Sequence, residues 1–163
     1  MFDTVLHSEH WPQWWHGVQA VRELAPGDAR GIGSIRRYVW QSPMLYRITF
    51  DACTEIIEQP DWIQARVSGD LNGSGCWRFS HHAGITTVHY DWQVQPARRW
   101  MRALAALLHG PFCINHRILM QRGAVGLAQR LAAPLIGVKS IEWNSKLETA
   151  TTTSLRFGPD DTG

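Results

Sequence analysis

The chain has 163 residues, which is enough for one domain with its own buried core, and its 16 Lys and Arg against 14 Asp and Glu give a formal charge of +2. Because the basic residues form no block, the charge pattern typical of a nucleic-acid-binding protein is missing. Three widely spaced cysteines, no secretory signal and no apolar run of about twenty residues predict a cytoplasmic protein without disulfides or a membrane span.

The N-terminal segment is predicted to be helical and rich in tryptophan. Phe2, Val5 and Leu6 have helical spacing, and Pro12 ends this first short helix. The following WPQWWHGV stretch is expected to form a turn or a second short helix whose indoles pack on the domain. Core packing is the expected role of most of the nine tryptophans.

From Ile32 onward the apolar residues alternate, which is the period of a half-buried strand. Turn-forming residues separate the strands, and links this short favour antiparallel neighbours. The predicted strands are Ile32–Trp40, Leu45–Ile57, Trp62–Gly69, Ser74–His82 and Ile85–Gln95.

Loop lengths predict which side chains share the inner face of this sheet. A two-residue loop at Ala83-Gly84 places Trp77 opposite Tyr90 and Phe79 opposite Val88. A three-residue turn at Leu71-Asn72-Gly73 and a four-residue loop at 58–61 extend the same face. The predicted inner face is Ile48, Phe50, Ala52, Ile56, Ile63, Val67, Trp77, Phe79, Val88, Tyr90, Trp92 and Val94.

One arginine of the first predicted strand must also point inward. An even loop at 41–44 turns Arg37 toward the inner face, and an odd loop turns Arg36 there. A buried guanidinium needs a carboxylate partner, a route to solvent, or an anionic or carbonyl group of a ligand. The alternative is an arginine that extends to solvent at the rim of the sheet.

A long amphipathic helix is predicted over residues 97–132. Apolar residues recur at steps of three or four along it, and Gly110-Pro111 predicts a kink. Pro134 ends the helix, and the polar residues that follow are interpreted as a mobile tail. The predicted organisation is therefore one domain at 1–134 and a tail at 135–163.

Several motifs together resemble the polyketide cyclase and dehydrase-like branch of the START or Bet v 1-like (SRPBCC) superfamily. They are WPQWWHGV at 11–18, GDARGIGSIRRYVW at 27–40, SGDLNGSGCWRF at 68–79, TTVHYDWQV at 86–94 and INHRILMQRGAVGLAQRL at 114–131. The resemblance implies an α+β helix-grip fold, in which a curved antiparallel sheet wraps around a long C-terminal helix. It also implies a cavity for an apolar or polyaromatic small molecule.

The chain departs from that family because no strand precedes the first helix. Strand 85–95 would then be an exposed edge, which is a liability for aggregation. Three arrangements would cover it: a start that lies upstream, a homodimer through this edge, or the stretch Thr149–Phe157 folded back onto it.

The candidate site residues lie on the inner face and on the long helix. His116 and Tyr90 are the candidate catalytic residues, His116 because its ordinary pKa suits proton transfer. An alternative is that Asn115 and His116 only satisfy backbone groups or tie the helix to the sheet. The candidate ligand-binding residues are Arg36, Arg37, Phe50, Trp77, Phe79, Tyr90, Trp92, Phe112, Asn115, His116 and Leu119.

These features predict a protein that binds an apolar small molecule, such as a lipid, quinone or polyketide-like aromatic, between the sheet and the long helix. One alternative is a cyclase or dehydratase that uses the polar cavity residues for proton transfer. Another is a protein-interaction module that uses the open edge. No metal or cofactor is expected, because adjacent histidines such as His81 and His82 point to opposite faces and no glycine-rich nucleotide loop is present.

Overall fold

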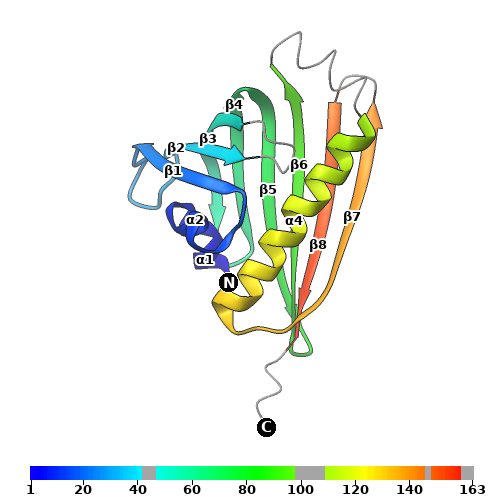
Figure 1. The fold of residues 1–163 in the computed structure, drawn as a ribbon. Helices are drawn as coiled ribbons and strands as arrows, with labels where there is room; N and C mark the ends of the chain where they lie inside the picture. Colours follow the sequence, from blue (N-terminus) through cyan, green and yellow to red (C-terminus); the bar gives the residue numbers. More distant parts are fainter. Residues whose placement is uncertain (42–46, 98–108, 146–147, 159–163) are drawn as a thin grey trace.

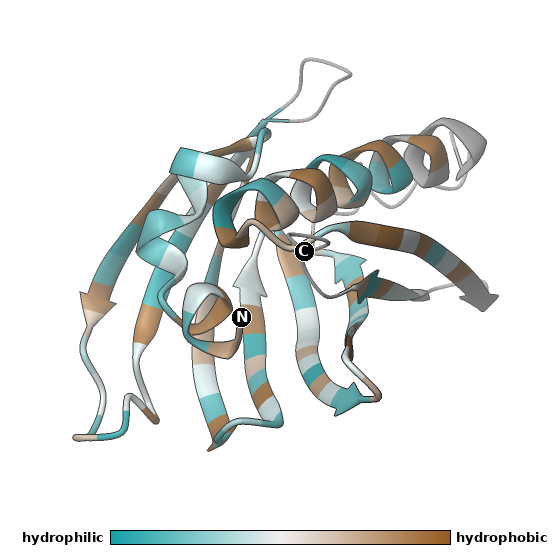
Figure 2. Ribbon diagram, turned by 90° about the horizontal axis from the view of Figure 1, so that it is seen from below, coloured by the Kyte–Doolittle hydropathy of each residue, from teal (hydrophilic) through white to brown (hydrophobic). Residues whose placement is uncertain are grey.

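A large antiparallel sheet dominates the computed structural model, and the described helices lie on one side of it (Figure 1). Figure 2 shows the same arrangement from below, with the sheet curving around the side that carries the helices. The structure describes residues 1–41, 47–97, 109–145 and 148–158.

The N-terminal helices are short. They are α1 (Phe2–Leu6), the 3-10 turn η1 (Ser8–His10) and α2 (Trp11–Trp14). Pro12 lies in the first turn of α2. Backbone amides in the first turn have no acceptor within the helix, so a proline there costs no helical hydrogen bond. The Trp11 indole donates to Val5 O at 3.1 Å and ties α2 back to α1.

Eight strands form the sheet in the order β1-β2-β3-β4-β5-β6-β8-β7. The first six follow the chain, and the last two exchange places. Their bounds are β1 (Val18–Ala25), β2 (Ile35–Gln41), β3 (Arg47–Glu58), β4 (Trp62–Gly69), β5 (Leu71–His82), β6 (Ile85–Pro96), β7 (Leu135–Ser145) and β8 (Glu148–Phe157).

The helix α4 (His109–Leu131) crosses the inner face of the sheet and contacts β7, β8 and α2. Its buried side carries Leu119, Met120, Ala124 and Leu127. The Trp15 indole donates to Leu119 O at 2.9 Å, so the N-terminal segment is tied directly to α4.

The predicted fold class is wrong, because the long helix is not the C-terminal element. Two long strands, β7 and β8, follow α4, so the molecule is mainly a large antiparallel sheet with short helices and α4 on one face. Of the predicted helix 97–132, the structure describes a helix only from His109 onward. Gly110 and Pro111 fall in its first turn, and residues 98–108 lie outside the described part.

Residues 135–157 form β7 and β8, so the stretch predicted to be a mobile tail belongs to the sheet. β8 pairs with β6 from Thr86 opposite Phe157 to Val94 opposite Thr149. Strand 85–95 is therefore not a free edge, which removes the surface on which the expected homodimer and interaction module depended. Of the three proposed arrangements, the folding back of Thr149–Phe157 is confirmed.

The register of the strands agrees in part with the sequence prediction. Trp77 pairs with Tyr90 and Phe79 with Val88, as the two-residue loop at Ala83-Gly84 requires. A bulge in β3 between Thr54 and Ile56 shifts the end of that strand by one residue. As a result Ile57, rather than the predicted Ile56, packs against the core.

Candidate functional site

A small cavity lies between the N-terminal helices and the inner face of β2 to β6, with a volume of about 60 Å³. Its helical wall includes Val5, Leu6, Ser8 and Trp11. The described residues that line it come from the N-terminal helices and from β2 to β6, and no described residue of α4 is among them.

The floor of the cavity consists of small residues on three neighbouring strands. Ala52 on β3, Ala65 on β4 and Gly75 on β5 all line it, and Ala65 is the register partner of Gly75. A Cβ atom added at Gly75 would lie 2.8 Å from the ring of Trp92. The cavity therefore exists because large side chains are missing from this part of the sheet.

Aromatic rings form most of the cavity wall. Two pairs are stacked: Trp77 on Tyr90 with ring centroids 3.9 Å apart, and Tyr38 on Phe50 at 5.2 Å. Alternation along the strands brings these rings to one face, since each pair consists of register partners on neighbouring strands. The aromatic lining residues are Trp11, Tyr38, Trp40, Phe50, Trp77, Tyr90 and Trp92.

Arg36 is the one charged residue among the described residues that line the cavity, and its side chain is only 16% exposed. One guanidinium nitrogen donates to Leu6 O at 2.9 Å, across to α1. Another lies 3.7 Å from the Glu9 carboxylate and 3.8 Å from that of Glu23. Its charge is therefore balanced by two carboxylates from the N-terminal segment and β1.

Two buried donors of the cavity have no acceptor. Arg36 Nε and Trp40 Nε1 are both inaccessible to solvent and form no hydrogen bond within the part of the chain that the structure describes. A buried N–H without a partner loses the free energy of its hydrogen bonds to water. Both residues line the same cavity, so an acceptor placed there could satisfy them.

The two cavity tyrosines differ in their hydrogen bonding. Tyr38 donates to Ser8 Oγ at 2.7 Å and so connects β2 to the 3-10 turn. Tyr90 is fully buried, and its hydroxyl forms no hydrogen bond with any described residue. Burial raises the pKa of Tyr38 and holds that of Tyr90 well above the ordinary value near 10. Both hydroxyls therefore remain protonated donors at neutral pH.

Arg36, rather than Arg37, faces the cavity. Arg36 is the register partner of Ala52, whereas Arg37 pairs with Asp51 and bonds its carboxylate at 2.7 and 2.8 Å on the outer face. This ion pair raises the pKa of Arg37 and lowers that of Asp51.

The other predicted site residues divide into two groups. Phe50, Trp77, Tyr90 and Trp92 line the cavity together with Arg36. The remaining described ones, Phe79, His116 and Leu119, do not.

Those three residues lie elsewhere in the fold. Phe79 packs edge-on against Phe2, with ring centroids 5.3 Å apart. His116 is partly buried on α4, and Leu119 is buried on α4 beside Trp15. The side chains of Phe112 and Asn115 lie outside the described part.

Sequence reasoning missed Ser8, Trp11, Tyr38 and Trp40 as cavity residues. The alternation of Arg36, Tyr38 and Trp40 along β2 was visible, but an undecided loop length left their face open. Trp11 and Ser8 carry no periodic signal that aims them at the sheet. The small residues Ala52, Ala65 and Gly75 could have been found by asking where the inner face lacks bulk.

Comparisons of the chain with family models, with curated proteins and with solved structures found no significant match. Within the described ranges, no helix is long and apolar enough to cross a membrane. Across those same residues, no three His, Cys, Asp or Glu side chains come together in a way that could hold a metal ion.

Proposed function

We propose that the protein binds a small, neutral aromatic molecule that carries carbonyl oxygens, such as a quinone or a polyketide-like aromatic. The ligand would occupy the cavity between the N-terminal helices and β2 to β6. Arg36, Trp40 and Tyr90 would donate hydrogen bonds to its oxygens, while the aromatic wall would cover its rings.

The observation that carries this proposal is a pair of buried donors, Arg36 Nε and Trp40 Nε1, that have no acceptor within the described part of the chain. They lie four residues apart on one strand, with Tyr38 between them, so their Cα atoms are separated by about 13 Å. A planar aromatic molecule that carries a carbonyl oxygen would offer an acceptor to a donor at either end of this aromatic wall.

The charges around Arg36 favour a neutral ligand over an anionic one. Glu9 and Glu23 already lie near the guanidinium. A carboxylate placed beside Arg36 would therefore also meet two like charges, which raises the free energy of binding. A carbonyl oxygen accepts the same hydrogen bond without that repulsion.

The size of the cavity requires that binding open it. A volume of about 60 Å³ is less than half of the roughly 150 Å³ that admits a benzene molecule. Two of the polar contacts that hold the N-terminal segment against the cavity join it to β2: Tyr38 to Ser8 Oγ at 2.7 Å and Arg36 to Leu6 O at 2.9 Å. We propose that this segment moves outward when the ligand enters.

A panel of three similar molecules tests the proposal. Tryptophan fluorescence can report binding, because four of the aromatic lining residues are tryptophans. We expect 1,4-naphthoquinone to bind about tenfold or more tightly than naphthalene, since it supplies two acceptors. We also expect it to bind more tightly than 2-naphthoate. Equal affinity for naphthalene, or a preference for 2-naphthoate, would contradict the proposal.

A pair of variants on β4 tests the position of the ligand. Ala65→Leu fills the floor of the cavity and should abolish binding of the naphthoquinone. Gln64→Leu adds a similar side chain one residue away on the opposite face and should leave the affinity unchanged. Loss of binding in both variants, or in neither, would place the ligand elsewhere.

The resemblance to the polyketide cyclase and dehydrase-like branch stays a prediction, and the cavity gives its enzymatic version no support. A cyclase or dehydratase needs a group that exchanges a proton near neutral pH. Burial holds the pKa of Tyr90 well above 10, and His116 does not line the cavity. Binding is therefore the function that we propose.

A further inference from the structure

The charged residues are distributed unevenly along the chain. Residues 92–141 contain seven basic residues and no acidic one, whereas the other 113 residues hold nine basic residues and all fourteen acidic ones. Asp91 and Glu142 bound this acid-free run, which includes the whole of α4. The stretch of sequence that includes α4 therefore carries a net positive charge that the overall value of +2 conceals.

Within this run, α4 exposes aliphatic side chains to solvent. Ile114 is 60% exposed, Ile118 37% and Val125 41%. At 100° per residue these three positions fall within about 40° of one another around the helix axis. They form a line along the side of α4 that faces away from the sheet, interrupted by the exposed Gln121 between Ile118 and Val125, and Figure 2 shows hydrophobic and hydrophilic residues alternating along this helix. We call this line the α4 stripe.

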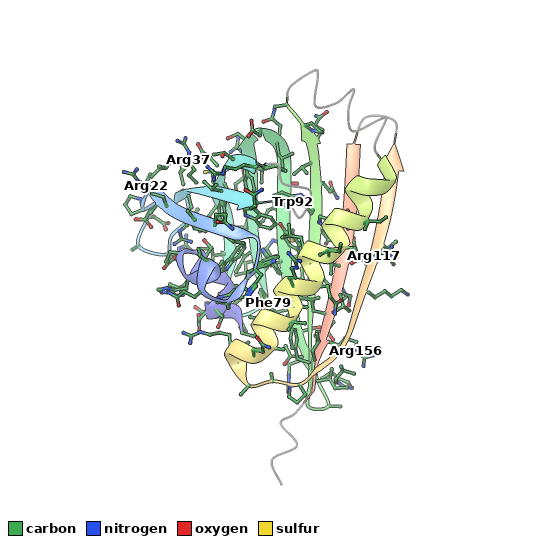
Figure 3. The ribbon with its side chains drawn as sticks, in the orientation of Figure 1. Arg22, Arg37, Phe79, Trp92, Arg117 and Arg156 are labelled. Carbon is green, nitrogen blue, oxygen red and sulfur yellow. The ribbon has the colours of Figure 1, made fainter. Side chains whose placement is uncertain are left out.

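Two arginines flank the α4 stripe. Arg117 lies on one side of it and Arg122 on the other, and both are exposed. Neither forms an ion pair with a residue that the structure describes. On the outer sheet face Arg37, Arg66 and Arg78 each pair with a carboxylate, whereas Arg22 and Arg156 form no ion pair with a described residue. Figure 3 shows Arg117 on α4, apart from Arg22 and Arg156.

We propose that the α4 stripe and its flanking arginines dock on an anionic lipid surface. Aliphatic side chains beside unpaired arginines match an interface in which hydrocarbon begins just below a layer of phosphates. A second copy of the chain fits less well, because a two-fold contact through this stripe would bring Arg117 and Arg122 against their own equivalents. A nucleic acid would use the arginines but leave the three aliphatic residues without a partner.

Sedimentation with vesicles tests this surface. The full chain should bind vesicles of 70% phosphatidylcholine and 30% phosphatidylserine, should not bind pure phosphatidylcholine, and should be released as NaCl rises from 0.1 to 0.5 M. The double variant Arg117→Gln with Arg122→Gln should lower the partition coefficient about thirtyfold, at about fivefold for each arginine. The double variant Ile114→Gln with Ile118→Gln should lower it about tenfold or more.

Matched controls separate this surface from a general effect of charge or hydrophobicity. Arg22→Gln with Arg156→Gln removes the same charge from exposed positions on β1 and β8, and it should change the partition coefficient less than twofold. Leu24→Gln, at a residue 45% exposed on β1, controls for the loss of an aliphatic side chain. Absence of binding, equal binding to both vesicles, an equal loss in the controls, or tighter binding to duplex DNA would each overturn the proposal.

Discussion

Tyr38 and Tyr90 allow a test at the scale of single hydroxyl groups. Tyr38→Phe removes the bond to Ser8 Oγ and leaves that buried hydroxyl without its donor. We expect the free energy of unfolding to fall by about 1 kcal/mol. Tyr90→Phe removes a hydroxyl that bonds no described residue, so it should change stability little. Urea unfolding measures both, and equal losses would contradict the assignment.

The buried tyrosines also predict how stability depends on alkaline pH. Burial raises the folded-state pKa of Tyr38 and Tyr90 above their ordinary value near 10. The neutral forms therefore stabilise the fold fully below pH 10, and this contribution is lost as the pH rises toward the folded-state values.

Urea unfolding between pH 9 and 11 measures this loss. Above pH 10 the slope of unfolding free energy against pH should be shallower in Tyr90→Phe, by about 1.4 kcal/mol per pH unit. The same slope in both proteins would show that Tyr90 ionises as freely in the folded state as in the unfolded one.

Among single residues, the sequence predicted Trp77, Tyr90 and Trp92 as cavity residues because both the alternation along their strands and the length of the connecting loop were clear. Trp77, Tyr90 and Trp92 lie on a strand pair whose two-residue loop has positive φ at Ala83 (50°) and Gly84 (76°), as a tight hairpin turn requires. The choice between Arg36 and Arg37 stayed open because the sequence did not show whether the loop before β3 has an even or an odd number of residues. Only the register of β2 on β3 resolves it.

The contact between α4 and α2 gives a prediction at the scale of elements. Gly126 lies inside α4, where alanine would ordinarily add about 1 kcal/mol of helix stability. A Cβ atom there would overlap the backbone oxygen of Trp14, so α4 would have to move away from α2. We therefore expect Gly126→Ala to lower the free energy of unfolding by about 2 kcal/mol or more.

Gly137 supplies the control for this substitution. A Cβ atom added at Gly137, on β7, meets nothing within 4 Å, so Gly137→Ala should be nearly neutral. Thermal unfolding of the two variants compares them directly. A Gly126→Ala protein more stable than the parent would contradict the close packing of the two helices.

Strands β7 and β8 were missed because their inner face does not look apolar. Thr151 and Thr153 are buried at positions where a strand of this length would ordinarily carry aliphatic residues, and Thr153 bonds Ser140 at 3.1 Å. The polar composition therefore hid the alternation of buried and exposed residues along these strands. Threonine suits such strands well, because it is β-branched. β1 was missed for a related reason, since most of its side chains are exposed.

Phe157 tests whether β8 belongs to the core. It is 1% exposed, and its backbone pairs with Thr86 on β6 and with Leu135 on β7. Phe157→Ala should lower the free energy of unfolding by about 3 kcal/mol or more. Ile136→Ala, at a residue 53% exposed, should have a small effect. If both substitutions were neutral in urea unfolding, the C-terminal residues would have to be detached from the sheet.

On the scale of the whole molecule, the chain separates two surfaces. The cavity lies under the N-terminal helices, and the α4 stripe with its flanking arginines lies on the outer side of α4. The period of α4 could be read from the sequence, and it also predicted the buried side of the helix, on which Leu119 and Leu127 lie. The cavity depended on contacts between residues as distant as Ser8 and Tyr38, which no local pattern encodes.

Indole N–H resonances recorded during a titration with 1,4-naphthoquinone test the central claim most directly. Trp40 and Trp62 both have a buried indole nitrogen with no acceptor among the described residues, but of the two only Trp40 lines the cavity. We predict that the Trp40 Nε1–H resonance moves downfield as its donor gains a carbonyl partner, while that of Trp62 stays in place. An unmoved Trp40 resonance at saturating naphthoquinone, or an equal shift at Trp62, would contradict binding in this cavity.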